Sequence, residues 1–331
     1  MRSEQVAEGV FRIPVPLPGN PLRELNAYLL PGGDRPLLID TGFRQEACRT
    51  ALWAGLAEHG LKPGEVEVLV THLHSDHSGM APETAEKRNI YISETDRLQL
   101  ADREALEEHR RLADARFRAE GFPEEVMADR ERSNPARAKA PPMSDRYVGL
   151  ADGQVLEAGG MRLECMQMPG HTPGQMCFWV EEQGLLFTGD HVLFDITPNI
   201  TAWPERQDSL GDYLASLVKI RSCDARLCLP GHRKSGDLKE RVDGLLEHHR
   251  CRLEEALAMV KAHPGLGAYE LAGYMTWKIR APSWEEFPVA QKWFAVGECM
   301  SHLDHLMERG LLRRETDRGL YRYFAQERKD G

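Results

Sequence analysis

Short apolar runs, separated by prolines, glycines and polar residues, dominate the chain up to about residue 230. Runs such as Leu25–Leu30 and Pro36–Asp40 predict strands that are joined by turns. Between residues 44 and 59 the apolar side chains recur at helical spacing and Gly60 follows them, which predicts a helix that ends there. A further strand is expected at Val66–Val70, so strands and helices are mixed in this part of the chain.

The middle of the chain predicts one long helix and an irregular segment. Apolar residues at helical spacing run from Ser93 to about Phe117, beginning with a capping-box-like segment, Ser93-Glu-Thr-Asp96. Residues 121–145 are polar and contain four prolines, which predicts a partly helical insertion or lid rather than core. Strands return at 155–230, interrupted by a helix near Leu210–Arg221.

The pattern changes after about residue 238, where helices replace strands. A long amphipathic helix is expected at Leu238–His263, and further helices are expected at Ala268–Trp277 and Val289–Arg309. A hairpin that turns at Asp317-Arg-Gly319 follows them. Helices followed by a terminal hairpin predict a winged-helix domain.

The length of 331 residues exceeds what one compact core usually needs, which favours two domains. We predict a catalytic domain over residues 1–245, with a helical insertion at about 95–150, and a winged-helix-like domain over 246–331. Apolar residues make up 41% of the chain, enough to bury a sizeable core.

Charge and cysteine content limit the partners and the compartment. The chain has 42 Lys and Arg against 52 Asp and Glu, and this net charge of −10 repels polyanions, so nucleic acid is not the favoured partner. Seven cysteines without a C-x-x-C pair are typical of reduced thiols in a cytosol. The N-terminus has no apolar leader, and no stretch reaches the roughly 18 apolar residues of a membrane span. We therefore expect a cytoplasmic protein that does not cross a membrane.

The strongest chemical signal is the loop Thr71-His72-Leu73-His74-Ser75-Asp76-His77, which directly follows the predicted strand at 67–70. Neutral imidazoles and carboxylates are ligands that Zn²⁺ and similar cations prefer. Three more apolar strands end in a glycine turn and then a candidate ligand: His171, Asp190 and His232. An ordinary turn role would explain any one of these residues, because His and Asp are common in loops. Their joint spacing has no packing explanation, and seven ligands suffice for two metal ions.

These motifs resemble one known family. The loop T-H-x-H-x-D-H, followed in order by P-G-H-T-P-G, T-G-D and P-G-H, is similar to the metallo-β-lactamase fold superfamily, especially its glyoxalase II-like branch, over about residues 8–235. The C-terminal part looks like the winged-helix extension of the lactamase-beta-like hydrolases. The resemblance implies an α/β fold, a four-layer αββα sandwich, with a small C-terminal winged-helix domain.

The resemblance also implies a role for each candidate ligand. The first metal ion would be held by three histidines: His72, His74 and His171. The second would be held by Asp76, His77 and His232. Asp190 would bridge the two ions, and Asp40 would support the ligands from behind; an ordinary turn role for Asp40 stays open. Zn²⁺ fits the imidazole-rich set best, and Fe or Mn could occupy it.

We expect a metal-dependent hydrolase in which a metal-bridging hydroxide attacks an ester-type bond, with Asp76 as both metal ligand and proton acceptor. A carboxylate at Asp190, where many true β-lactamases have Cys, argues against antibiotic hydrolysis. His74 stands where flavodiiron proteins carry Glu, which argues against that redox branch. The leading substrate is a small acyl thioester, such as an acyl-CoA or an acylglutathione; a lactonase and a metal-dependent endoribonuclease are the alternatives.

A DNA-binding regulator is a weaker alternative, because the candidate recognition helix Val289–Arg309 carries acidic as well as basic residues. Its apolar stripe indicates a core contact or a homodimer contact. His302 and His305 share one helix at a spacing that can bind metal, although surface histidines are commoner there.

Eight basic residues between 110 and 139 form a possible phosphate-binding lid: Arg110, Arg111, Arg116, Arg118, Arg130, Arg132, Arg137 and Lys139. Acidic residues between them favour a solvated helix face with paired charges instead.

Overall fold

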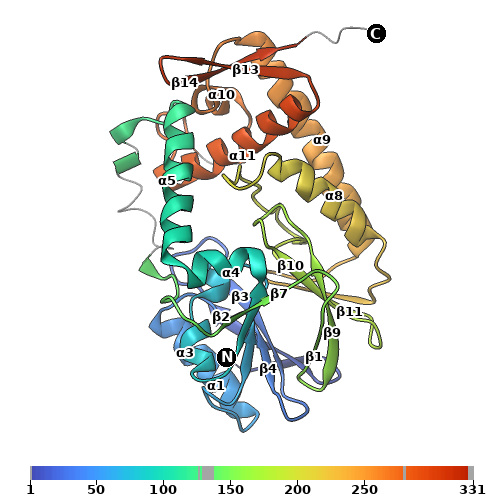
Figure 1. Ribbon diagram of the computed structural model, residues 1–331. Helices are drawn as coiled ribbons and strands as arrows, with labels where there is room; N and C mark the ends of the chain where they lie inside the picture. Colours follow the sequence, from blue (N-terminus) through green and yellow to red (C-terminus); the bar gives the residue numbers. More distant parts are fainter. Residues whose placement is uncertain (1, 126, 129–137, 279–280, 327–331) are drawn as a thin grey trace. The chain divides into compact units, whose positions relative to one another are not determined.

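Figure 1 shows the chain as a computed structural model that describes residues 2–125, 127–128, 138–278 and 281–326. Contacts within the chain divide it into two compact units, which are described separately. Unit 1 consists of Met1–Leu106, Ala136–Pro198 and Val218–Val242, and unit 2 consists of Glu107–Pro135, Asn199–Leu217 and Asp243–Gly331. The predicted domain boundary between residues 245 and 246 stays a prediction.

Seven strands of unit 1 form a sheet in the order of the sequence. They are β1 (Glu4–Ala7), β2 (Val10–Pro16), β3 (Glu24–Leu30), β4 (Leu37–Ile39), β5 (Glu67–Leu69), β6 (Ile90–Ser93) and β7 (Tyr147–Leu150). Neighbours from β1 to β4 are antiparallel, whereas β4 to β7 are parallel. The prediction that the helical insertion extends to about residue 150 is wrong at its end, because β7 is a strand. Four residues that include Gly149 are too few to give a clear strand pattern.

Five further strands of unit 1 form a second sheet in the order β12-β11-β10-β9-β8. Their bounds are β8 (Val155–Ala158), β9 (Met161–Gln167), β10 (Met176–Val180), β11 (Leu185–Gly189) and β12 (Leu227–Pro230). Only β11 and β12 pair in parallel among these strands, and the other pairs are antiparallel. Because β9 and β11 are both antiparallel to β10, the strands β9, β11 and β12 run in one direction.

The helices of the first half correct one prediction. They are α1 (Glu46–Glu58), α2 (Ser75–Ser78), α3 (Ala81–Ala85), α4 (Glu94–Ala101) and α5 (Arg103–Ala119). The single helix predicted from Ser93 to Phe117 is wrong, because the chain is interrupted at Asp102, whose backbone is extended (φ −122°, ψ 116°). The Asp102 carboxylate accepts hydrogen bonds from the backbone nitrogens of Glu104 and Ala105 and so caps the second helix.

Two apolar clusters show how unit 1 is layered. One lies between the sheets and combines Leu30 and Ile39 of the first with Phe178 and Phe187 of the second. The other lies on the opposite face of the first sheet, where Leu52 and Leu56 of α1 pack with residues of β2 and β3. The first sheet is therefore buried on both faces, by helices and by the second sheet, which explains its nearly continuous apolar strands. The predicted α/β sandwich is confirmed.

Unit 2 is mainly helical and ends in a hairpin. It contains α10 (Ala268–Tyr274), α11 (Val289–Glu308), β13 (Leu312–Asp317) and β14 (Leu320–Ala325), with most of α5, α8 (Ser209–Arg221) and α9 (Leu238–Ala262). The three helices and the hairpin predicted after residue 238 are confirmed, and the winged-helix arrangement stays a prediction. Within the described ranges, no helix has the length and apolar character to cross a lipid bilayer.

Three basic residues of the expected lid, Arg111, Arg116 and Arg118, are paired with acids. Arg111 and Arg118 form exposed ion pairs with neighbouring glutamates. Arg116 donates to the buried carboxylate of Glu120 and to Asp304. These pairs favour the paired helix face over a phosphate site. Three residues of the predicted lid lie outside the described residues: Arg130, Arg132 and Arg137.

His302, expected on the surface of a helix, is instead buried with His249 in unit 2. His302 Nδ1 donates to the carbonyl oxygen of Glu298 (2.6 Å), which leaves its Nε2 to accept from His249 Nδ1 (3.3 Å). Burial lowers the pKa of His249 to about 2 and that of His302 to about 3. Both rings are therefore neutral at physiological pH.

This pair predicts a pH-dependent stability. Folded-state pKa values below the unfolded value of about 6.5 mean that the unfolded chain binds more protons, so stability is lost as the pH falls below about 6.5 towards the folded-state values. Each histidine contributes up to about 1.4 kcal/mol per pH unit in this window. We expect the free energy of unfolding in urea, measured between about pH 6 and pH 4.5, to fall less steeply in His249→Asn, which keeps the donor to His302. Equal slopes in the variant and the wild type would contradict this role.

Candidate metal centre

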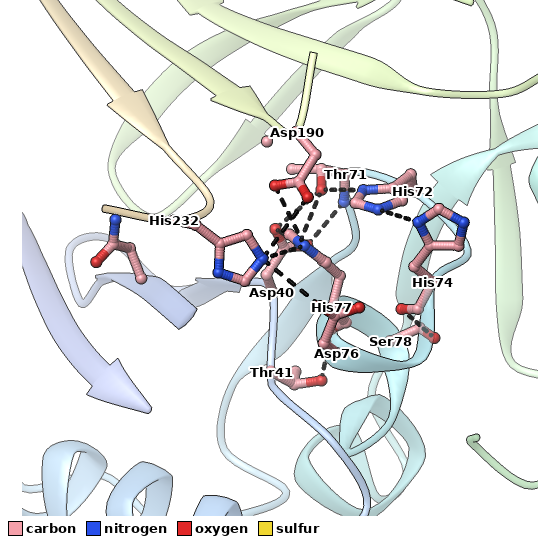
Figure 2. Close-up of polar contacts among 12 residues, drawn as sticks. Asp40, Thr41, Thr71, His72, His74, Asp76, His77, Ser78, Asp190 and His232 are labelled. Carbon is pink, nitrogen blue, oxygen red and sulfur yellow. Dashed lines mark hydrogen bonds and ion pairs between the residues drawn. The ribbon is translucent and has the colours of Figure 1, made fainter. Parts of the chain in front are cut away.

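The candidate ligands follow the C-terminal ends of four strands in unit 1. The loop 71–77 follows β5, whereas His171 follows β9, Asp190 follows β11 and His232 follows β12. Strands β9, β11 and β12 run in one direction, so their ends reach the same edge of the second sheet. Figure 2 shows that Asp190 and His232 point towards the histidines of the loop 71–77. The structure therefore brings together residues that are up to 160 positions apart, from His72 to His232.

The first group consists of His72, His74 and His171, whose nearest ligand atoms all lie within 4.8 Å of one another. His72 Nε2 lies 3.0 Å from His74 Nδ1. The ring of His171 is centred 4.9 Å from that of His72 and 4.7 Å from that of His74. Three imidazole nitrogens thus lie close enough to share one cation, and they form the first group that the family resemblance implies.

The second group consists of Asp76, His77 and His232, with the same spacing limit of 4.8 Å. His77 Nε2 lies 3.2 Å from His232 Nε2, and His232 Nε2 lies 3.6 Å from Asp76 Oδ2. The short helix α2 places Asp76 and His77 on consecutive positions of one turn. These residues form the second group that the family resemblance implies.

Asp190 lies between the two groups. Its Oδ1 is 3.4 Å from His77 Nε2, and its Oδ2 is 3.8 Å from His171 Nε2 and 3.6 Å from His232 Nε2. The carboxylate therefore reaches one histidine of the first group and two of the second. This is the position that a bridging ligand requires.

Asp40 and a backbone carbonyl orient the two histidines of the second group. Asp40 Oδ2 accepts a hydrogen bond from His77 Nδ1 (2.7 Å), and His232 Nδ1 donates to the carbonyl oxygen of Glu24 (2.7 Å). Asp40 also accepts from the backbone nitrogen and the hydroxyl of Thr71, both at 2.9 Å. Because the Nδ1 atoms are used in this way, each Nε2 presents its lone pair to the centre. The structure thus favours the supporting role for Asp40 over an ordinary turn role.

The electrostatics of the centre favour a positive charge. Burial lowers the pKa of His72 well below its usual value and that of His74 to about 3, so these rings stay neutral. Burial also works against the charged form of His77, but the carboxylates of Asp40 and Asp190 outweigh it and raise the pKa of His77. Burial opposes ionisation of Asp190 too, yet His232 and His77 hold its pKa below its usual value. The carboxylates thus favour a positive charge at this point, which a bound metal ion would supply in place of a proton on His77.

Two residues that hold the His232 loop were missed by sequence reasoning. The Asn26 side chain on β3 donates to the carbonyl oxygens of Pro230 (2.9 Å) and Arg233 (3.0 Å). The hydroxyl of Tyr28 also donates to the Pro230 carbonyl oxygen (2.8 Å). The sequence signal that could have indicated the role of Asn26 is its position as a polar residue within the apolar run Leu25–Leu30. Its partners, however, lie more than 200 positions away.

Two segments of the chain match known protein families. Residues 21–232 match the family described as the metallo-beta-lactamase superfamily, which is more than half of the chain. The chain belongs to the metallo-beta-lactamase superfamily. Residues 285–326 match a second family, described as a metallo-beta-lactamase-like C-terminal domain. The family predicted from the loop motifs is therefore confirmed, and the chain is a hydrolase of this fold.

Three similar proteins illustrate the range of this superfamily. A metallo-beta-lactamase family protein from Thermus thermophilus is 31% identical with a TM-score of 0.81, and the match covers 97% of this chain and 100% of that one. The lactamase-like protein adaB of Aspergillus niger is 26% identical over 89% of this chain and 88% of its own length. An atrochrysone carboxyl ACP thioesterase of Aspergillus novofumigatus is 26% identical over 78% of this chain, which spans only 65% of that protein.

The residues present fit the divalent cations that this superfamily implies. Imidazole nitrogens and carboxylate oxygens form the donor set that Zn²⁺ accepts, and they lie within 4.8 Å of one another in each group. In particular, the two Nε2 atoms of His77 and His232 face each other at 3.2 Å while their Nδ1 atoms donate elsewhere. Two nitrogen lone pairs that approach so closely are stabilised by a shared cation.

Proposed function

We propose that this hydrolase cleaves thioester bonds at a centre of two divalent cations, with Zn²⁺ as the favoured metal. The observation that carries the proposal is the convergence of two ligand groups on either side of Asp190. The first cation is assigned to His72, His74 and His171. The second is assigned to Asp76, His77 and His232. Asp190 is assigned to both.

When bound, two cations at such a centre lower the pKa of a water molecule and polarise a substrate carbonyl. Asp76 is suited to hold and accept the proton of the attacking water, because its side chain is 14% exposed whereas that of Asp190 is 7% exposed. Asp40, which is buried behind His77, instead keeps that ring in place. Asp76 and Asp40 thus have different roles because Asp76 is more accessible to water than Asp40.

The proposed reaction forms a bond between the water oxygen and the acyl carbon and breaks the bond from carbon to sulfur. The thiolate leaves, and the proton accepted by Asp76 can return to it. A thiol has a pKa of about 8.5, so a thiolate is a good leaving group at neutral pH without full protonation by an acid. An alkoxide departs less readily, which favours a thioester over an oxygen ester at this centre.

Relatives support an acyl thioester as the substrate class. Two proteins that are 26% and 27% identical to this chain are named atrochrysone carboxyl ACP thioesterases, although the chain spans only 65% and 63% of their lengths. We propose an acyl group on a small thiol carrier, such as coenzyme A or glutathione. A lactonase would use the same attack on a cyclic ester and is the second candidate. The net charge of −10 disfavours a nucleic acid substrate.

A matched substrate panel tests the proposal. We expect the zinc-loaded protein to hydrolyse an acyl-CoA and an S-acylglutathione with a kcat/KM at least about tenfold above that for the oxygen ester of the same acyl group, a difference of about 1.4 kcal/mol in the barrier. Release of thiol is followed with a chromogenic disulfide. A chelator should abolish the activity and Zn²⁺ should restore it. Faster hydrolysis of lactones than of every thioester would overturn the proposal in favour of the lactonase.

A further inference from the structure

Asp96 is a fully buried carboxylate of unit 1 that contacts two of the ligand loops. Its Oδ2 accepts hydrogen bonds from the backbone nitrogen of Leu73 (2.9 Å) and from the hydroxyl of Thr172 (2.7 Å). Its Oδ1 accepts a hydrogen bond from the backbone nitrogen of Gly174 (2.7 Å). One side chain therefore satisfies three donors from two segments that are about 100 residues apart.

The positions of these donors matter because each lies next to a candidate ligand. Leu73 stands between His72 and His74 in the sequence, and Thr172 directly follows His171. The first of these segments follows β5 of the seven-stranded sheet, and the second follows β9 of the five-stranded sheet. Asp96 thus joins, across the two sheets, the backbone segments that carry all three histidines of the first group.

Asp96 is held in place by the start of α4. The hydroxyl of Ser93, at the end of β6, accepts a hydrogen bond from the backbone nitrogen of Asp96 (3.1 Å). A carboxylate in the first turn of a helix is stabilised by the partial positive charge of that end. The second loop comes close because residue 174 is glycine, since a Cβ there would collide with Ser93 Oγ and with the Asp96 carboxylate.

The histidines of the second group have supports of a different kind. His77 is oriented by Asp40 (2.7 Å), and His232 is oriented by the carbonyl oxygen of Glu24 (2.7 Å). We propose that Asp96 is a positioning residue for the first cation site, acting through the backbone of the loops that carry His72, His74 and His171. This inference rests on the proposed metal centre and adds a buried support for the first cation site besides Asp40, which contacts His77 of the second group directly and reaches His72 of the first group through the Thr71 hydroxyl.

Asp96→Asn tests the proposal in the full-length protein. Asparagine keeps the size of the side chain but replaces one acceptor oxygen with an NH₂ group that faces a donor of Leu73, Thr172 or Gly174. We expect a titration of metal-depleted protein with Zn²⁺, read by calorimetry and by competition with a chromogenic chelator, to show one of two binding steps weakened by about 10–100-fold. The other step should keep its affinity.

Two controls separate positioning from a general loss of stability. Glu120→Gln changes another fully buried carboxylate, one that accepts from the backbone nitrogen of Ala268 and the hydroxyl of Tyr323 in unit 2. It should lower the melting temperature and leave both binding steps unchanged. Thr172→Val removes one donor to Asp96 and should weaken the same binding step as Asp96→Asn. Thr172→Ser keeps the hydroxyl, so its affinity in that step should equal that of the wild type.

The outcomes distinguish this inference from the proposed function. A wild-type protein that binds no cation would refute both. If the wild type binds two cations and Asp96→Asn binds both with unchanged affinity, the metal centre stands and the positioning role is refuted. Equal weakening of both steps would also refute it, because a single site is expected to respond. Should Asp96→Asn fail to fold, unchanged binding in Thr172→Val would refute it as well.

Discussion

Replacing Asp190 with alanine will lower kcat/KM for the best thioester by about 10²–10³-fold, the range found when one preorganised electrostatic group is removed from an active site. The carboxylate is buried and lies within 3.8 Å of histidines in both ligand groups. A neutral water molecule in its place would not supply the negative charge that the carboxylate provides there. Metal analysis of the variant should show fewer than two ions per chain.

The matched control for Asp190→Ala is Asp195→Ala, which removes an exposed carboxylate five positions further along the same segment. We expect its activity and metal content to equal those of the wild type. Wild-type activity in Asp190→Ala would show that this carboxylate is not part of the reaction centre.

Adding one methyl group at Gly231 will also inactivate the enzyme. A Cβ at this position would lie 2.7 Å from Asp190 Oδ1 and 2.7 Å from His77 Cε1, closer than real Cβ contacts allow. One or both ligands must therefore move in Gly231→Ala, and a displacement of about 1 Å in a catalytic group can cost about 10²-fold in rate. The measurements are kcat/KM and the affinity for Zn²⁺, and both should fall.

Gly244→Ala is the control for this substitution. Gly244 lies on an exposed position of α9, and an added Cβ meets nothing within 4 Å. Alanine is favoured over glycine in a helix by roughly 0.5–1 kcal/mol, so Gly244→Ala should raise the melting temperature without changing kcat/KM. If Gly231→Ala also left kcat/KM unchanged, the inference that this loop closely approaches the ligands would be refuted.

The candidate ligands could be predicted because their signals are local. His72, His74, Asp76 and His77 share one loop, and each remaining ligand follows an apolar strand and a glycine. Strands that run in one direction end at one edge of a sheet, which explains why His171, Asp190 and His232 lie together. Their approach to the loop 71–77 also requires the two sheets to pack against each other. The two long helices after residue 238, α9 and α11, were also predictable, because their apolar periodicity extends over many turns.

Apart from Asp40, the supporting residues could not be predicted, because their interactions join distant parts of the chain. Asp96 fits an ordinary helix start, and nothing in the sequence near it indicates that its carboxylate bonds to Leu73 and Gly174. The Asn26 side chain likewise donates hydrogen bonds to the distant carbonyl oxygens of Pro230 and Arg233. Asp102 was missed for another reason, since aspartate is acceptable both within a helix and as a cap, and the tertiary fold decides between the two.

Because four of the seven candidate ligands follow β5 and the other three follow strands of the second sheet, neither sheet alone presents a complete pair of binding groups. Metal uptake during refolding must then wait until the two sheets have docked. The appearance of bound Zn²⁺ in a refolding experiment would report the moment of sheet association rather than the formation of either sheet. Excess Zn²⁺ would therefore favour the docking of the two sheets, which is the last assembly step, and would leave the rates of the earlier steps unchanged.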